Sequence, residues 1–152
     1  MVEHHRRVVG GQWPVRVADE AWARRREQYS AWLSEDTGFI FIAYAEDSDN
    51  PVGYAACRLL PAGPTFDLGE PRGDVDSLVT AERVRGRGVG SALLSACRNE
   101  LRRRGARYWS IGVVEANTGA IELYERLGFR PFVRSTLAAI DESPQAVEAG
   151  DA

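Results

Sequence analysis

The stretch from Arg83 to Leu94, RVRGRGVGSALL, constrains the fold of this chain more than any other feature of its sequence. Gly86, Gly88 and Gly90 alternate with larger residues directly before an apolar periodicity that predicts a helix. The segment ahead of this stretch, DVDSLVT, has the composition of a strand. The order of strand, glycine-rich loop and helix predicts a crossover unit, with the loop at the carboxyl end of the strand.

This glycine-rich loop is a candidate anion site. Glycines leave backbone N–H groups unobstructed where the first donors of a helix lack partners and the helix dipole is positive. Arg85 and Arg87 add permanently charged guanidinium groups, and Ser91 adds a hydroxyl in the first turn. The pattern therefore favours a pyrophosphate site, and the alternative is a tight turn with solvated arginines. It lacks the Gly-Lys-Ser/Thr of a nucleotide P-loop, and its third glycine comes too early for a dinucleotide fingerprint.

Composition narrows the class of protein. The 152 residues, 44% of them hydrophobic, suffice for one core, and a net charge of −3 argues against a general nucleic-acid or membrane-surface binder. Cys57 and Cys97 lack the spacing of metal ligands, so we expect two reduced and partly buried thiols. The adjacent His4 and His5 lack a third metal ligand, so we expect them at a flexible terminus. The sequence has no apolar run of membrane-spanning length and no signal peptide, so a cytoplasmic protein is expected. No bound metal is expected, because the cysteines and histidines lack the spacing of metal ligands.

Hydrophobic periodicity and turn signals predict the other elements. Helices are expected over residues 19–33, from 89 to a stop at 105, and over 118–127. Strands are expected over 38–45, 52–60, 74–80, 107–114 and 129–139. The first two strands should form an antiparallel hairpin, because a turn of Asp, Asn and Pro residues separates them. Residues 1–140 are predicted to form one domain, followed by a polar tail over 141–152.

A second stretch, YWSIGVVEANTGAIELYERLGF, sets Asn117 and Tyr124 seven residues apart. Seven residues are two helical turns, so both side chains are expected on one face of a short helix, where they can converge on one ligand. The alternatives are a helix-capping role for Asn117 and core packing for Tyr124.

These two stretches together resemble the GNAT superfamily of acetyl-CoA-dependent N-acetyltransferases. The resemblance covers roughly residues 39–133 and rests on Arg85-x-x-Gly88-x-Gly90, Asn117-x-x-Ala120-x-x-x-Tyr124 and Leu127-Gly128-Phe129. It implies an α/β fold with a mixed, mostly antiparallel sheet, splayed between the fourth and fifth family strands and flanked by helices. It also implies that acetyl-CoA lies in the gap and that its acetyl group passes directly to a primary amine of a small molecule or peptide. The alternative is a non-catalytic acyl-CoA-binding regulatory module.

The resemblance implies roles for individual residues. Backbone groups of the strand before the loop would pair with the pantetheine arm, and the loop and first helical turn would hold the pyrophosphate; these residues are Leu78, Val79, Thr80, Arg85, Gly86, Arg87, Gly88, Val89, Gly90 and Ser91. Asn117 would orient the pantetheine arm. Tyr124 would lie beside the sulfur, where its phenol could protonate the departing thiolate.

The general base is where this chain departs from the family. Relatives that acetylate protein N-termini carry a glutamate five residues before the asparagine, and Gly112 occupies that position here. Asp76 and Glu115 are the acidic residues best placed to replace it, directly or through water, and surface roles are their alternative. Asp74 is a third candidate, because the period of two places it on the same strand face as Asp76.

The amino-terminal region departs from the family as well. Residues 2–9 resemble the latter half of the first family helix, so the first family strand is expected to be missing. The sheet edge this leaves less covered makes a homodimer the candidate assembly. Trp13, Trp22 and Trp32 are expected to pack in the core, with a role in an acceptor pocket as the alternative. The expected partner is the small-molecule or peptide amine acceptor, and binding to nucleic acid or to a membrane is not expected.

Overall fold

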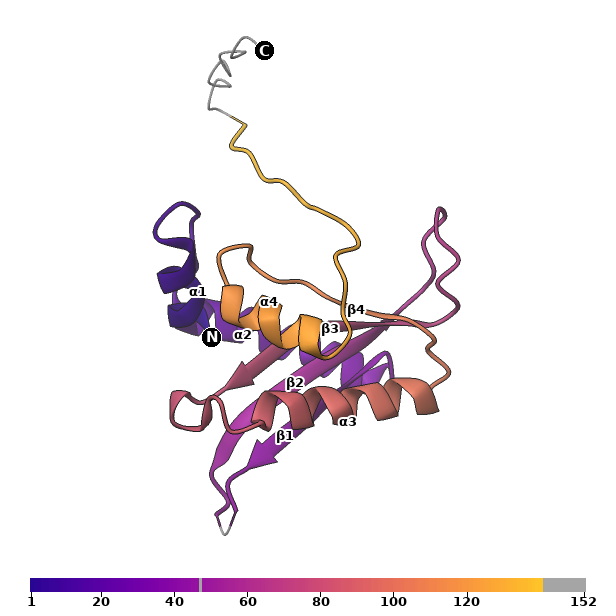
Figure 1. Ribbon diagram of the computed structural model, residues 1–152, viewed down its shortest axis with the longest axis horizontal. Coiled ribbons are helices and arrows are strands. Elements are labelled where there is room, and N and C mark those ends of the chain that lie inside the picture. The colour runs from indigo at the N-terminus through magenta and orange to yellow at the C-terminus, as the bar shows by residue number, and fades with distance from the viewer. Residues whose placement is uncertain (47, 141–152) are drawn as a thin grey trace.

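The structure is a computed structural model that describes residues 1–46 and 48–140 (Figure 1). Its elements are α1 (Val2–Val9), α2 (Ala18–Ser34), β1 (Gly38–Tyr44), β2 (Pro51–Leu60), β3 (Arg72–Thr80), the short 3-10 helix η1 (Glu82–Val84), α3 (Val89–Arg103), β4 (Trp109–Ile111) and α4 (Thr118–Arg126). Helix α3 crosses one face of the sheet, and α2 lies behind the strands (Figure 1). The predicted polar tail over 141–152 lies outside the described residues.

The strands form one mixed sheet in the order β1-β2-β3-β4. β1 and β2 pair as the predicted antiparallel hairpin, β2 and β3 are also antiparallel, and β3 and β4 run parallel. This is the mixed, mostly antiparallel sheet expected from the sequence. Between β2 and β3, Ala56 pairs with Ser77 and Cys57 with Val75, so Asp76 is the extra residue of a β-bulge.

The sheet opens immediately after this bulge begins. The parallel pairing of β3 with β4 extends only from Gly73 opposite Trp109 to Val75 opposite Ile111. β3 then continues to Thr80 while it pairs with β2 alone. A gap between these two parallel strands therefore starts at Asp76, which agrees with the splayed sheet expected of the fold.

The core lies between α3 and the sheet. Its buried residues are Phe39, Ala55, Cys57 and Val75 from the strands and Leu93, Leu94, Cys97 and Leu101 from α3. Gly73 is required for this packing, because a Cβ added there would lie 2.6 Å from a methyl group of Leu101. Cys57 and Cys97 are both free, as predicted, and they are fully buried, where the sequence predicted partial burial.

Two predicted strands differ from the structure. The strand predicted over 107–114 is limited to Trp109–Ile111, because its pairing with β3 ends where Val75 lies opposite Ile111. The strand predicted over 129–139 is wrong: these residues have no regular secondary structure, and residues 131–140 are exposed. A strand needs a partner for its backbone groups, and Pro131 removes one N–H donor from this segment.

The amino-terminal expectation agrees with the structure. Residues 2–9 form α1, and no strand precedes Trp13 in this described region. His4 and His5 lie within that helix, half-buried, so the flexible terminus expected for them is wrong. Among the helices of the described ranges, none has both the length and the apolar character needed to cross a bilayer.

Candidate active site

The glycine-rich loop has the backbone that the sequence predicts. Gly86 and Gly88 have φ angles of 75° and 83°, in the left-handed region that favours glycine. Gly88 is the N-cap of α3, and the first backbone bond onto the helix runs from the N–H of Ala92 to the carbonyl of Gly88. Within the described ranges, the N–H groups of residues 89–91 donate to no backbone carbonyl, and the first turn has no acidic residue. The start of α3 is therefore an open anion cradle.

Side chains around this cradle add positive charge and apolar contacts. Arg85 and Arg87 are exposed, and Nη1 of Arg85 lies 3.5 Å from Oε1 of Glu82, a weak contact that an anion could replace. A Cβ added to Gly90 would lie 3.4 Å from Leu123 of α4 and 3.9 Å from Leu78 of β3. The first turn of α3 thus lies against both α4 and the far end of β3, which brings the two predicted motifs to one place.

The end of β3 forms one side of the gap. Leu78, Val79 and Thr80 pair with Ala55, Tyr54 and Gly53 of β2, and they have no partner from β4. All three are half-buried. The backbone of this segment is therefore paired with β2 along one edge. Its other edge lies toward β4 but does not pair with it.

Asp76 lies where the gap begins. Asp76 is exposed, and its Oδ2 accepts hydrogen bonds from the Tyr29 hydroxyl at 3.2 Å and from Ser77 Oγ at 3.0 Å. Tyr29 is only 5% exposed, and burial raises the pKa of its phenol, so it remains a donor at physiological pH. Two hydrogen bonds from fixed groups hold this carboxylate in one orientation.

Asn117 and Tyr124 both lie on the short helix, as predicted. Asn117 is the N-cap of α4, yet its side chain makes no capping hydrogen bond to the helix. Tyr124 is half-buried against the core, with its ring centroid 5.9 Å from that of Phe129. Burial raises the pKa of the Tyr124 phenol, which keeps it protonated at neutral pH.

The other acidic candidates have different surroundings. Glu115 is exposed and pairs at 2.7 Å with Arg134, another exposed residue. Asp74 is engaged on both oxygens, by Arg58 Nε at 3.0 Å and by Ser110 Oγ at 2.8 Å. Gly112 follows the end of β4, and a Cβ added there would meet nothing within 4 Å. Of the acidic residues considered, Asp76 is the one at the opening of the sheet.

The tryptophans do not all pack as expected. Trp22 is 55% exposed, so the core position expected for it is wrong. Trp22 lies on an exposed part of α2, because Tyr29 is the one buried residue of that helix. Trp13 and Trp32 are half-buried, and Trp32 packs on Tyr29 with ring centroids 5.2 Å apart.

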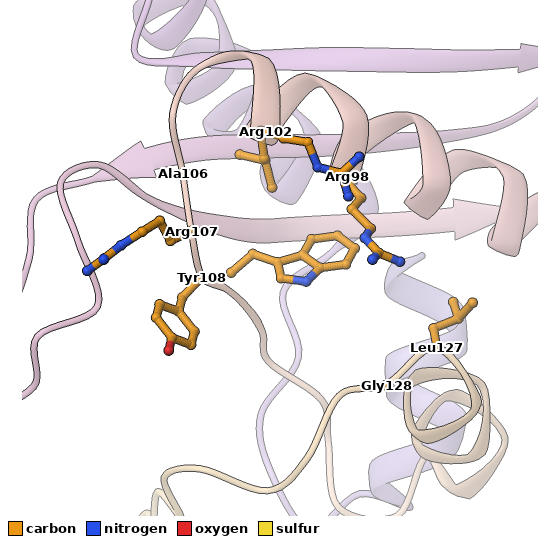
Figure 2. Close-up of a pocket in the computed structure, with 9 residues that line it drawn as sticks. Arg98, Arg102, Ala106, Arg107, Tyr108, Leu127 and Gly128 are labelled. Atoms are coloured by element: carbon orange, nitrogen blue, oxygen red, sulfur yellow. The ribbon is translucent and has the colours of Figure 1, made fainter.

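A cavity of about 360 Å³ lies at the opposite end of α3 from the cradle. Figure 2 shows Arg98 and Arg102 extending over it from α3, with Leu127 and Gly128 on the other side. The same helix end carries Glu100, which pairs with Arg103 and Arg104, and these contacts hold the pKa of that carboxyl at about 2. Because this cavity lies at the C-terminal end of α3, its residues do not belong to the cradle.

Tyr29, Ser77 and His4 are site residues that sequence reasoning missed. Tyr29 lies in a helical pattern that reads as core packing, and Ser77 reads as an ordinary strand residue. His4 lies close enough to Asn117 and Arg85 for both to act on its imidazole. The contacts of Tyr29 and His4 join segments far apart along the chain, so no spacing in the sequence indicates them, and the contact of Ser77 with its neighbour Asp76 follows from the local conformation of β3.

Comparison with known proteins fits this geometry. The model of the acetyltransferase (GNAT) family matches residues 6–129. The chain belongs to the GNAT family. An uncharacterized N-acetyltransferase of Methanocaldococcus jannaschii is 33% identical over 111 residues, covering 71% of this chain and 45% of the relative. A mycothiol acetyltransferase of Saccharomonospora viridis is 34% identical over 107 residues, 70% of this chain and 34% of the relative. The GNAT chain thus spans less than half the length of these two relatives.

Solved structures show the same GNAT fold. A tetramutant protein of Bacillus halodurans superposes with a TM-score of 0.72 at 19% identity, over 91% of this chain and 86% of the other. The acetyltransferase AAC(6')-Iy, in complex with the bisubstrate analog CoA-S-monomethyl-acetylneamine, gives a TM-score of 0.66 at 22% identity, over 91% and 90%. Across the described residues no group of three His, Cys, Asp or Glu side chains could hold a metal ion.

Proposed function

We propose that this GNAT protein is an acyl-CoA N-acyltransferase that transfers an acetyl group from acetyl-CoA to a primary amine of a small molecule or peptide. The observation that carries the proposal is the coincidence of two openings at one end of the sheet. β3 and β4 separate after Val75, and the free N–H groups at the start of α3 lie against the same end of β3 through Gly90 and Leu78. A long ligand with an anionic group at one end fits that combination.

The residues present fit the coenzyme. The open space at Gly86 and Gly88 permits close approach of a pyrophosphate to the backbone, and Arg85 and Arg87 add charge. Leu78, Val79 and Thr80 offer the free edge of β3 to the pantetheine arm, and the uncapped side chain of Asn117 offers an amide. Bound acetyl-CoA would supply the activated thioester.

Asp76 is the proposed general base. An alkylamine is protonated at neutral pH, because its pKa is about 10, and it attacks a carbonyl only after losing a proton. Oδ1 of Asp76 is free of protein partners in the described residues, so it can accept that proton directly or through water while Tyr29 and Ser77 hold Oδ2. Glu115 remains the second candidate, through water.

Tyr124 is the proposed general acid. As the nitrogen–carbon bond forms and the carbon–sulfur bond breaks, the sulfur leaves as a thiolate that needs a proton, and the Tyr124 phenol would donate it. A backbone N–H near Val79 or Thr80 would stabilise the negative charge on the carbonyl oxygen. No covalent bond to the protein is required.

The acceptor is proposed as a small amine because the similar proteins named above include a mycothiol acetyltransferase and an aminoglycoside N-acetyltransferase. The experiment is a screen of amino acids, polyamines, aminoglycosides and peptides with acetyl-CoA, in which release of the free thiol and mass of the product are both measured. Transfer to at least one amine is expected. Tight binding of acetyl-CoA without transfer to any of them would favour the non-catalytic regulatory module instead. Absence of coenzyme binding would overturn both functions.

A further inference from the structure

Helix α1 lies beside the anion cradle although it is remote from it in sequence. Oε1 of Glu82, in η1, lies 3.4 Å from Nη1 of Arg7 on α1 and 3.5 Å from Nη1 of Arg85 in the loop. Nη2 of Arg6 donates at 3.1 Å to the carbonyl of Arg16, which ties α1 to the segment before α2. Helix α1 is thereby held from two sides with one of its faces toward the cradle.

His4 of α1 lies near two of the site residues. The side chains of Asn117, at the start of α4, and of Arg85, in the glycine-rich loop, are both near enough to its imidazole to shift its pKa. Its Nδ1 is shielded from solvent and makes no hydrogen bond within the described residues. A polar atom that is buried without a partner costs free energy, so its place in a binding site calls for a ligand group.

The charge state of this imidazole defines the ligand group that it can bind. Burial lowers the pKa of His4, and the positive charges of Arg85, Arg7 and the N-terminus lower it further, while a hydrogen-bonding contact with the side chain of Asn117 raises it. The ring is therefore neutral at physiological pH and offers one N–H donor and one lone pair. Such a ring suits amide and hydroxyl groups better than it suits a phosphate.

We propose that His4 binds the pantetheine arm of the coenzyme through Nδ1, so that α1 forms one wall of the coenzyme site. This inference rests on the proposed function. The arm joins the pyrophosphate to the sulfur and carries amide and hydroxyl groups along its length, so the part of it between the cradle and Asn117 passes His4. The neutral imidazole exchanges a hydrogen bond with one of those groups.

His5 provides a matched control from the same helix. Its pKa is lowered by burial, by His4, by the N-terminus and by Arg25 of α2, and neither Asn117 nor the glycine-rich loop acts on it. The two imidazoles therefore have different charged and polar neighbours: Arg85, Arg7 and Asn117 for His4, and Arg25 for His5. Replacement of either one removes the same chemical group from the same eight-residue helix.

The experiment measures the affinities of CoA and ADP by calorimetry for the wild type, His4→Ala, His4→Gln and His5→Ala. ADP shares the adenosine and pyrophosphate with CoA but lacks the pantetheine arm. For CoA, His4→Ala is expected to weaken binding by about 3-fold to 10-fold, the effect of one neutral hydrogen bond, and His4→Gln is expected to weaken it less. ADP affinity should stay unchanged in every variant, and His5→Ala should match the wild type.

Each other outcome overturns the inference in a recognisable way. Equal CoA affinity in His4→Ala and the wild type would remove His4 from the site while leaving the proposed function intact. Equal losses for CoA and ADP would place the effect of His4 at the pyrophosphate or in the fold, as would equal losses in His4→Ala and His5→Ala. Failure of the wild type to bind CoA at all would overturn the proposed function itself.

Discussion

The hydroxyl of Tyr29, on α2, donates a hydrogen bond over 3.2 Å to Oδ2 of Asp76, the bulge residue of β3. This contact joins the helix on one face of the sheet to the point where β3 and β4 separate. A bulge locally disrupts the pairing of a strand, and bulges are frequent beside active sites. Tyr29 is therefore a positioning residue for the carboxylate that we propose as the general base.

Asp76→Asn is expected to lower kcat for acetyl transfer by about 10²-fold to 10⁴-fold, because the amide cannot accept a proton. Tyr29→Phe, which keeps the buried ring, should lower kcat by a smaller factor with an unchanged KM for acetyl-CoA. Steady-state kinetics at saturating amine measure both changes. A Tyr29→Phe enzyme whose KM and melting temperature change in place of kcat would show that the tyrosine only supports packing.

Two variants serve as controls for this prediction. Asp74→Asn disrupts contacts with Arg58 and Ser110, so it should lower the melting temperature and leave kcat nearly unchanged. Gly112→Glu places a carboxylate at the family position, where an added Cβ meets nothing within 4 Å. Combined with Asp76→Asn, it is expected to restore part of the lost rate. If Asp74→Asn proves as slow as Asp76→Asn, the base has been assigned to the wrong residue.

Gly88→Val is expected to abolish acetyl-CoA binding. A Cβ at this position meets no protein atom within 4 Å, so it would enter the space that the cradle leaves for a pyrophosphate. The substitution also strains the backbone, because φ is 83° and a β-branched side chain rarely adopts that conformation. Calorimetric titration with CoA measures the affinity.

Gly105→Val separates these two effects. Gly105 follows the other end of α3, has a φ of 84° and has the same open surroundings. Both variants should lose about 1 to 3 kcal/mol of stability from backbone strain, seen as lower melting temperatures. Only Gly88→Val should lose CoA affinity. An equal loss in both would mean that strain, and not occupation of the cradle, accounts for the result.

Local signals in the sequence were sufficient for the elements that form the cradle. The glycines before Val89 and the spacing of Asn117 and Tyr124 specify backbone conformation and helix face, and both depend on neighbouring residues alone. The strand predicted after Phe129 failed for a different reason, because apolar residues do not form a strand without an edge to pair with. Pro131 also weakens any such pairing.

The bulge at Asp76 could not be predicted from the sequence. The period of two predicted Asp74 and Asp76 on one strand face, and the alternation of buried and more exposed residues along β3 agrees with it, but the pairing pattern makes Asp76 alone the extra residue of the bulge. Asp74 pairs with Arg58 of β2, whose guanidinium lies over Trp32 of α2, whereas Asp76 accepts a hydrogen bond from Tyr29 of the same helix. Long-range packing decides which carboxylate lies where β3 and β4 separate, and this cannot be predicted from the spacing of residues within β3.

The histidines of α1 predict how stability changes with pH. The pKa values of His4 and His5 are lowered in the folded protein, mainly by burial, so below pH 6.5 the unfolded chain binds more protons than the folded one. The free energy of unfolding should therefore fall as pH is lowered through this range and be fully retained above it. Melting temperatures between pH 7.5 and 5.5 measure the change. A His4→Gln, His5→Gln double variant should flatten the slope, and an unaltered slope would contradict the assignment.

The last prediction concerns Tyr124, because it separates a catalyst from a protein that only binds the coenzyme. Tyr124→Phe removes the hydroxyl and keeps the ring against Phe129, so CoA affinity and melting temperature should barely change. kcat should fall by about 10²-fold to 10⁴-fold, toward the lower end because a thiolate is a tolerable leaving group. Since burial raises the pKa of this phenol, wild-type kcat should not decline through mildly alkaline pH from loss of the acid. The measurement is kcat against pH for both proteins at matched acetyl-CoA saturation. An unchanged kcat, with chemistry shown to limit turnover, would leave Tyr124 as a packing residue and assign protonation of the sulfur to water or another group.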